Sequence, residues 1–331
     1  LNCYEKFFIP SLSPIALNIT VISIALSLRN YFASPAYAFA VGVVVGGVLQ
    51  LAIQIPSLKK LGLNFKPTFF FRDPDIGRIV RLLIPTLFGV AIYEINIIIS
   101  QLIASFLEAG TVSSLQYSSR LLELTLGIFV VSIATVILPR MAKEAASGQF
   151  SEMAKTLKHS LSIVIFITLP ATLGLIMLRR DIVIALFAYG AFDEVSISLT
   201  AWALLFHALG LAFVAGCRIT VPAFYSLKDT KTPVAISFVA MIINVFGCLV
   251  LPMFLGNGGI ALANSLSIAV MFFLLLCKLN SLQLKIDLKE MAQKNATVLV
   301  PLMLMGLSVA ILKFFFSIAI DDPLIQRMGK I

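Results

Sequence analysis

Nine stretches of mostly apolar residues, each about 20 residues or longer, constrain the fold of this chain more than any other feature of its sequence. A helix of about 20 apolar residues crosses a hydrocarbon core about 30 Å thick. Backbone N–H and C=O groups find no water in that core, so such a segment must satisfy them internally, as a helix does. The stretches lie near residues 9–28, 33–55, 80–106, 112–138, 157–178, 197–220, 233–254, 258–278 and 295–318. The sequence therefore predicts an all-α polytopic membrane protein with about nine transmembrane helices.

Composition excludes several classes of protein. Hydrophobic residues make up 60% of the chain and charged residues only 12%, against about 25% charged in soluble domains. The net charge of +9 would suit nucleic acid, but the basic residues lie in short loops between apolar stretches and not on a soluble face. No phosphate-binding glycine loop, nucleophile elbow or Cys/His cluster with metal-ligand spacing occurs in the sequence. We therefore expect no nucleic-acid partner, no enzyme activity, no bound metal and no cofactor.

The charges of the loops alternate along the chain. The loops after the second, fourth, sixth and eighth stretches are rich in Lys and Arg, whereas the loops between them are nearly neutral or acidic. Because Lys and Arg are retained on the cytoplasmic side, this alternation predicts an orientation. Residue 1 is expected in the cytoplasm and residue 331 outside.

Two charged residues, Arg120 and Glu123, interrupt the apolar stretch 112–138. Each charge would cost about 2.5–3.5 kcal/mol at the centre of a membrane helix. Positions three apart share a helix face, and Arg120 lies about 12 Å into the span at 1.5 Å per residue. The pair is either a structural ion pair that locks two helices, or a binding site. In the second case Arg120 binds an anionic group such as a phosphate, Glu123 orients it and Ser119 adds a hydroxyl donor.

Other polar residues within the spans are weaker candidates. Glu94 lies in the stretch 80–106, and Asn244 and Asn264 lie in two later stretches. Together they would form a cation or proton site, or they make ordinary hydrogen bonds between helices. Gly42 and Gly46, four residues apart, predict close helix packing. We expect Lys313, near the outer end of the last stretch, to extend to the membrane surface.

Similarity between the region that begins at "SPIALNITVISIALSL" and the region that begins at "TPVAISFVAMIINVFGCLVL" indicates two repeats. If these helix pairs are equivalent, four helices should precede the first of them. The chain also opens on Leu1 and enters an apolar stretch almost at once. We therefore expect it to be a fragment.

Four segments carry a resemblance to a known family: "GGVLQLAIQIPSLKKLG", "LQYSSRLLELTLGIFVVSIATVILPRMAKEAASG", "LFAYGAF" and "PAFYSLKDTKTPV". In this order they resemble the MurJ (MviN) lipid II flippase family of the MOP transporter superfamily, and the resemblance extends over essentially the whole chain. It implies two six-helix lobes followed by a terminal helix pair, with an incomplete N-lobe here. Residues 1–56 would be the last two N-lobe helices, 57–79 a cytoplasmic linker, 80–280 the C-lobe, and 281–331 the first helix of the terminal lipid-groove pair with an outer tail.

The resemblance also implies an activity. Such proteins translocate lipid II, the undecaprenyl-pyrophosphate-linked peptidoglycan precursor, across the bacterial cytoplasmic membrane by alternating access. Arg120 and Glu123 match the family's "R-L-x-E" helix, whose arginine is implicated in diphosphate recognition; the position before that arginine is commonly Asp and here is Ser119. Coupling to membrane potential, Na⁺ or H⁺, with Glu94 as the candidate residue, and contacts with cell-wall synthesis proteins stay open. Two alternatives remain, an ion-coupled exporter of another substrate and a non-transporting membrane scaffold.

Overall fold

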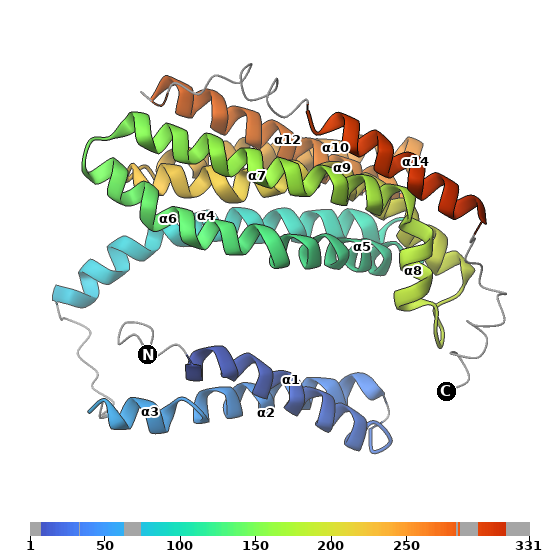
Figure 1. Cartoon of the computed structure of the whole chain (residues 1–331). Coiled ribbons are helices and arrows are strands. Elements are labelled where there is room, and N and C mark those ends of the chain that lie inside the picture. Colours follow the sequence, from blue (N-terminus) through green and yellow to red (C-terminus); the bar gives the residue numbers. More distant parts are fainter. Residues whose placement is uncertain (1–7, 33, 63–73, 283, 285–296, 316–331) are drawn as a thin grey trace. The chain divides into compact units, whose positions relative to one another are not determined.

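The computed structural model describes residues 8–32, 34–62, 74–282, 284 and 297–315 (Figure 1). Within these ranges every regular element is a helix, which confirms the predicted all-α class. The chain divides into two compact units, Leu1–Pro74 and Asp75–Ile331. The division falls inside the segment 57–79 that the sequence predicts as a linker, and each unit is described by itself.

Seven helical segments among the described residues are long and apolar enough to cross a membrane. They are Phe8–Leu28, Pro35–Lys60, Thr111–Ala146, Phe150–Met177, Glu194–Ser226, Lys231–Val250 and Asn257–Ser281. Two shorter apolar helical segments, Ala91–Ser105 and Leu299–Lys313, fall inside the predicted stretches 80–106 and 295–318. The chain is thus a multi-pass membrane protein, while the count of nine spans stays a prediction.

The first unit is a helical hairpin of α1 (Phe8–Leu28) and α2 (Pro35–Ala52), followed by the short α3 (Ile55–Lys60). A Cβ atom added at Gly42 would stand 3.1 Å from the carbonyl oxygen of Val21, and one at Gly46 would stand 3.1 Å from that of Leu17. The missing side chains therefore let the two backbones approach closely. This confirms the close packing predicted from the glycine spacing.

The second unit is built around α9 (Glu194–Ser226), which packs against α5, α6, α7, α8 and α12 (Figure 1). The other helices are α4 (Pro74–Ser105), α5 (Thr111–Thr125), α6 (Val131–Ala146), α7 (Phe150–Met177), α8 (Arg179–Phe187), α10 (Lys231–Val250), α11 (Pro252–Leu255), α12 (Asn257–Ser281) and α14 (Leu299–Phe315). Gly210 and Gly216 of α9 face Ser265 and Phe272 of α12 at distances that leave no room for a Cβ atom. Small residues on α9 thus set how closely α12 packs.

A π-helical turn, η2 (Leu126–Val130), joins α5 to α6 within one continuous span. A π-helical turn widens the helix locally and is often found near functional sites. Here it begins three residues after Glu123. The charged end of this span is therefore separated from its apolar half by a local change in helix geometry.

Candidate functional site

Four charged side chains gather on three helices of the second unit, and we call them the charged cluster: Glu94 of α4, Arg120 and Glu123 of α5, and Arg218 of α9. Arg218 pairs with Glu123 at 2.8 Å, Arg120 lies one turn before Glu123 on the same helix, and all four charges lie within electrostatic range of Tyr93. Charges inside membrane helices are rare and usually face a bundle interior or a water-filled cavity. The cluster is therefore the first candidate for a functional site.

The Glu123 carboxylate is held by Arg218. The Nη2 of Arg218 donates to both carboxylate oxygens, at 2.8 Å and 2.9 Å. Within the described ranges no hydrogen bond or ion pair joins Glu123 to Arg120, so the expected pairing of these two residues is not present. Both lie on one face of α5, but a side chain on the neighbouring α9 reaches the carboxylate first. Arg120 is exposed on this unit, and the part of the chain described here offers it no ion-pair partner.

Sequence reasoning missed Arg218, although a signal was present. The residue stands in "GCRIT", inside the predicted stretch 197–220, where a charge is as costly as it is at Arg120. Helix α9 continues to Ser226, so Arg218 lies two turns inside the helix and not at its end. An inspection of every charge within the nine stretches would have identified it.

The serines beside Arg120 have different partners. The fully buried Ser118 hydroxyl is 2.8 Å from Nδ1 of His207 on α9. The Ser119 hydroxyl donates to the carbonyl of Gln116 in its own helix at 2.9 Å. Ser118 and His207 therefore fasten α5 to α9, while the oxygen of the half-buried Ser119 remains an acceptor beside Arg120. The substrate-binding role of Ser119 stays a prediction.

The residues of the predicted cation site are distributed differently. Asn244 is fully buried, and its Nδ2 donates to Oδ1 of Asn96 at 2.8 Å and to Oγ of Ser100 at 2.9 Å. These bonds fasten α10 to α4 and match the alternative reading, hydrogen bonding between helices. Glu94 is exposed on α4, and no hydrogen bond within the described residues links it to Asn244 or Asn264. Glu94 thus belongs with the charged cluster, and the cation or proton site of Glu94, Asn244 and Asn264 stays a prediction.

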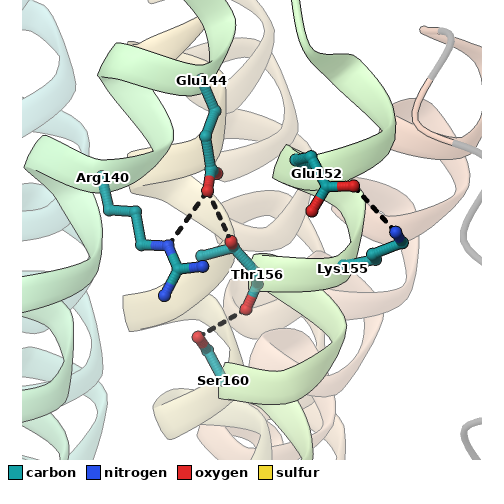
Figure 2. Close-up of polar contacts among 6 residues, drawn as sticks. All are labelled: Arg140, Glu144, Glu152, Lys155, Thr156 and Ser160. Atoms are coloured by element: carbon teal, nitrogen blue, oxygen red, sulfur yellow. Dashed lines mark hydrogen bonds and ion pairs between the residues drawn. The ribbon is translucent and has the colours of Figure 1, made fainter.

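A second polar cluster joins the ends of α6 and α7. Figure 2 shows Arg140 and Thr156 directed at the same oxygen of Glu144: Arg140 Nε donates at 3.0 Å and Thr156 Oγ1 at 2.9 Å. Glu144 is only 8% exposed, and its other oxygen, Oε2, has no hydrogen-bond partner among the described residues. Nearby, Lys155 pairs with Glu152 at 2.8 Å. The buried carboxylate joins the two helices through Thr156 of α7, while Arg140, on α6 with Glu144, holds the carboxylate in place.

Two carboxylates outside the spans cap helices. The backbone and side chain of Ser196 donate to Asp193 at the N-terminus of α9, and these bonds hold the pKa of Asp193 below its ordinary value. Partial burial opposes ionisation of Asp229, but hydrogen bonds from Thr232 and Lys231 outweigh it and lower the pKa of that carboxyl. Both groups are therefore ionised at neutral pH, where they stabilise the starts of α9 and α10.

Lys313 binds the end of a neighbouring helix. Its Nζ lies 2.8 Å from Oδ2 of Asp181 and donates to the carbonyl of Met177 at 3.0 Å, while 39% of the side chain stays exposed. The expectation that Lys313 extends to the membrane surface stays a prediction. The contact joins α14 to the end of α7 and the start of α8.

Comparisons with known proteins relate the chain to one family. A family model described as lipid II flippase MurJ matches residues 1–321. The chain is 36% identical over 267 residues to a Vibrio cholerae protein named "Probable lipid II flippase MurJ", which covers 81% of this chain and 51% of the relative. It is 33% identical over 323 residues to a Haemophilus influenzae protein of the same name, covering 96% of this chain and 62% of the relative. The chain therefore spans between about half and two thirds of the length of these relatives.

Solved structures show the same arrangement of helices. A lipid II flippase MurJ in an inward closed conformation superposes with a TM-score of 0.74 at 25% identity, covering 95% of this chain and 68% of that one. A Vibrio cholerae MATE transporter, VcmN, superposes with a TM-score of 0.62 at 11% identity, covering 85% and 64%. At that identity the second likeness shows a shared fold and nothing more.

Proposed function

Because this chain belongs to the lipid II flippase MurJ family, we propose that it forms part of a flippase for lipid II, the undecaprenyl-pyrophosphate-linked peptidoglycan precursor, in the bacterial cytoplasmic membrane. Transport follows alternating access, in which a central site opens to one side of the membrane at a time. The names of its relatives favour this proposal over an ion-coupled exporter of another substrate and over a non-transporting scaffold.

The observation that carries the proposal is the unequal pairing of the two arginines. Arg218 is neutralised by Glu123 at 2.8 Å and 2.9 Å, while Arg120 has no such partner in the described part of the chain. A guanidinium offers paired N–H donors that match the oxygens of a phosphate. We assign Arg120 the first contact with the precursor's diphosphate; Ser119 beside it would donate to the diphosphate only after giving up its hydrogen bond to the Gln116 carbonyl.

Glu123 then has two roles. It holds Arg218 in place, and its negative charge opposes a diphosphate that approaches the same guanidinium. A flippase must release what it binds, so a competing carboxylate keeps the substrate from staying at the cluster. Arg218 becomes a second contact only when the diphosphate displaces Glu123.

The proposed orientation places residue 1 in the cytoplasm and residue 331 outside. The ends of α6 and α7 beside their connecting loop carry Arg140 and Lys155, so this loop would be cytoplasmic. A cysteine introduced at Ser147 in this loop should stay unlabelled when an impermeant thiol reagent is added to intact cells, whereas one at Asn30, exposed in the predicted outer turn after α1, should be labelled. Labelling at position 147 alone would reverse the orientation.

We also propose that the return of the empty flippase is coupled to membrane potential, Na⁺ or H⁺ at Glu94. Moving one charge across the membrane is worth about 2.3 kcal/mol per 100 mV. Glu94→Gln should therefore weaken the dependence of transport on potential or sodium and leave precursor binding within about fivefold of wild type. A larger loss of binding with unchanged coupling would assign Glu94 to the substrate contacts instead.

The function itself is tested in a chimera in which this chain replaces the matching 62% of the Haemophilus influenzae relative. Translocation of fluorescent lipid II is measured in proteoliposomes, with growth of a flippase-depleted strain as a second readout. Arg120→Ala should slow translocation at least about tenfold, and Arg120→Lys should fail as well, because an ammonium cannot make the bidentate contact. The matched control is Arg29→Ala, an exposed arginine in the turn after α1. Normal transport by Arg120→Ala at equal protein level would refute the assignment.

A further inference from the structure

A cavity of about 420 Å³ in the second unit is lined by residues from the first turns of α5 and α9 and from the loop that joins α8 to α9. This volume is within the range of small-molecule sites, about 300–1,000 Å³. Gly110, at the N-cap of α5, has φ +91, a conformation that an L side chain rarely adopts, and it begins the helix at the edge of the cavity. The cavity is separate from the charged cluster, because no member of that cluster lines it.

Aromatic rings form one side of the cavity. Tyr117 of α5 packs on Phe187 with ring centroids 4.8 Å apart, and its edge meets Phe192 at 5.3 Å. Tyr117 nevertheless keeps 39% of its surface exposed and Tyr189 keeps 67%. The phenylalanines thus hold Tyr117 in place, and surface of both tyrosines remains for a ligand to stack on.

Hydroxyl groups form the other side. Ser113 is exposed in the first turn of α5, and Thr200 lines the cavity from α9. Thr200 is fully buried, and its Oγ1 has no hydrogen-bond partner among the described residues. Buried hydroxyls are nearly always paired in native proteins, so Thr200 has a free hydrogen-bonding group that a ligand would satisfy if it filled the cavity deeply enough to reach it.

The lining residues contain no charged side chain; besides those named above they are glycine, alanine and serine. An ionic ligand would lose its hydration there without gaining a counter-charge. The matching chemistry is an uncharged molecule with an apolar face and a rim of hydroxyl or amide groups. A pyranose ring has both, since its C–H face stacks on aromatic rings while its hydroxyl groups hydrogen-bond to Ser and Thr.

The position along α5 connects this cavity to the proposed substrate. Ser113 and Arg120 are seven residues apart, so they lie on nearly the same helix face about 10.5 Å from each other along the axis. In a lipid-linked saccharide the first sugar follows directly after the diphosphate. We propose that this cavity binds a neutral sugar ring of the precursor's glycan while Arg120 holds its diphosphate. The assignment of the sugar to the lipid-linked precursor rests on the proposed function, whereas the binding of a neutral sugar by this cavity does not.

The first experiment measures binding of N,N′-diacetylchitobiose, a neutral disaccharide, to the whole chain in nanodiscs. Saturation-transfer NMR reports contact and calorimetry reports affinity. We expect millimolar or tighter binding that Ser113→Tyr, which fills the cavity, weakens at least about tenfold. The matched control is Ser198→Tyr, an exposed serine in the first turns of α9 that does not line the cavity. No binding by the wild-type chain, or equal binding by the two tyrosine variants, would overturn the proposal.

The variant Thr200→Val tests the site with a substitution that should not disturb the fold. Valine has nearly the shape of threonine, and the lost hydroxyl has no partner to leave behind, so thermal stability should not fall. Sugar binding should weaken at least about threefold. Unchanged binding would remove Thr200 from the site and, with it, the reason for assigning the cavity to a hydroxylated ligand.

Two further comparisons separate this inference from the proposed function. Arg120→Ala should keep disaccharide binding, and its loss there would move the sugar to the charged cluster and overturn the cavity site. In the chimera, Ser113→Tyr should slow lipid II translocation. If it abolishes sugar binding while translocation is normal, the sugar belongs to a free glycan and the assignment to the lipid-linked precursor is wrong. Absence of lipid II translocation by the unsubstituted chimera, with intact sugar binding, would refute the flippase proposal alone.

Discussion

Removing the negative charge of Glu123 should tighten the binding of a diphosphate. In Glu123→Gln the glutamine no longer neutralises Arg218, so a second guanidinium becomes available beside Arg120. The substitution also removes a like charge from the approach of the anion. Both effects act in the same direction, and the side-chain shape is almost unchanged.

The magnitude follows from the geometry of the pair. Arg218 and Glu123 are 2.8 Å apart at their closest atoms, with 31% and 46% of their side chains exposed. Water therefore screens the attraction, and pairs of this exposure contribute about 1 kcal/mol or less. If Arg218 no longer has to be released from Glu123, this free energy of about 1 kcal/mol is added to diphosphate binding, which becomes about fivefold tighter.

Equilibrium dialysis of labelled pyrophosphate against the whole chain in nanodiscs measures this gain. Glu152→Gln is the matched control, because Glu152 also pairs with a basic side chain at 2.8 Å but lies at the start of α7. The double variant Glu123→Gln, Arg218→Gln should lose the gain. An affinity of Glu123→Gln equal to or below that of wild type would refute the reasoning, since Arg218 would then not reach the anion.

Three other predictions concern stability in detergent. Asn244→Ala should lower the free energy of unfolding by about 2 kcal/mol, since it removes two hydrogen bonds at a fully buried site; thermal unfolding followed by circular dichroism measures it. Thr156→Val should lower the free energy of unfolding by about 1–2 kcal/mol in the same assay, because it leaves the buried Glu144 with one donor fewer. The control Thr232→Val, at a partly buried position in the first turn of α10, should lower it less. The pKa of Asp193 is lowered in the folded chain, so the ionised carboxylate stabilises the fold above the ordinary aspartate pKa. This stabilisation is lost as pH falls through the pKa of the folded chain. The melting temperature of Asp193→Asn should therefore decline less than that of wild type between neutral and acid pH.

Hydropathy predicted the membrane class and the approximate spans, because the length and the apolar side chains of a segment largely decide whether it can cross the bilayer as a helix. It could not place the ends. The predicted stretch 197–220 stops before Pro222, yet α9 continues to Ser226, since this proline lies near the end of a well-packed helix. Glycine spacing predicted the close contact of α2 because glycines four residues apart on one helix face let another backbone approach. The short turn between α1 and α2 makes α1 that neighbour.

Partners far apart in the sequence were beyond this kind of reasoning. Asn244 bonds to Asn96 and Ser100, nearly 150 positions earlier, and a polar residue in a span does not say which neighbour it faces. The same limit applies to Glu123. Sharing a helix face with Arg120 made the two look like partners, but long side chains extend toward whichever neighbouring helix offers a charge. Arg218 on α9 offered it.

The charge balance of the cluster gives this arrangement a consequence. Two arginines and two glutamates bring a formal charge of zero to the region around Tyr93. A diphosphate that enters makes the region strongly negative, so neutralising either glutamate favours binding. A cation or proton at Glu94 would therefore strengthen diphosphate binding, and by linkage the diphosphate must strengthen binding of that cation or proton by the same factor. Substrate binding and the proposed coupling ion thus act through one set of charges, and release of one weakens the hold on the other.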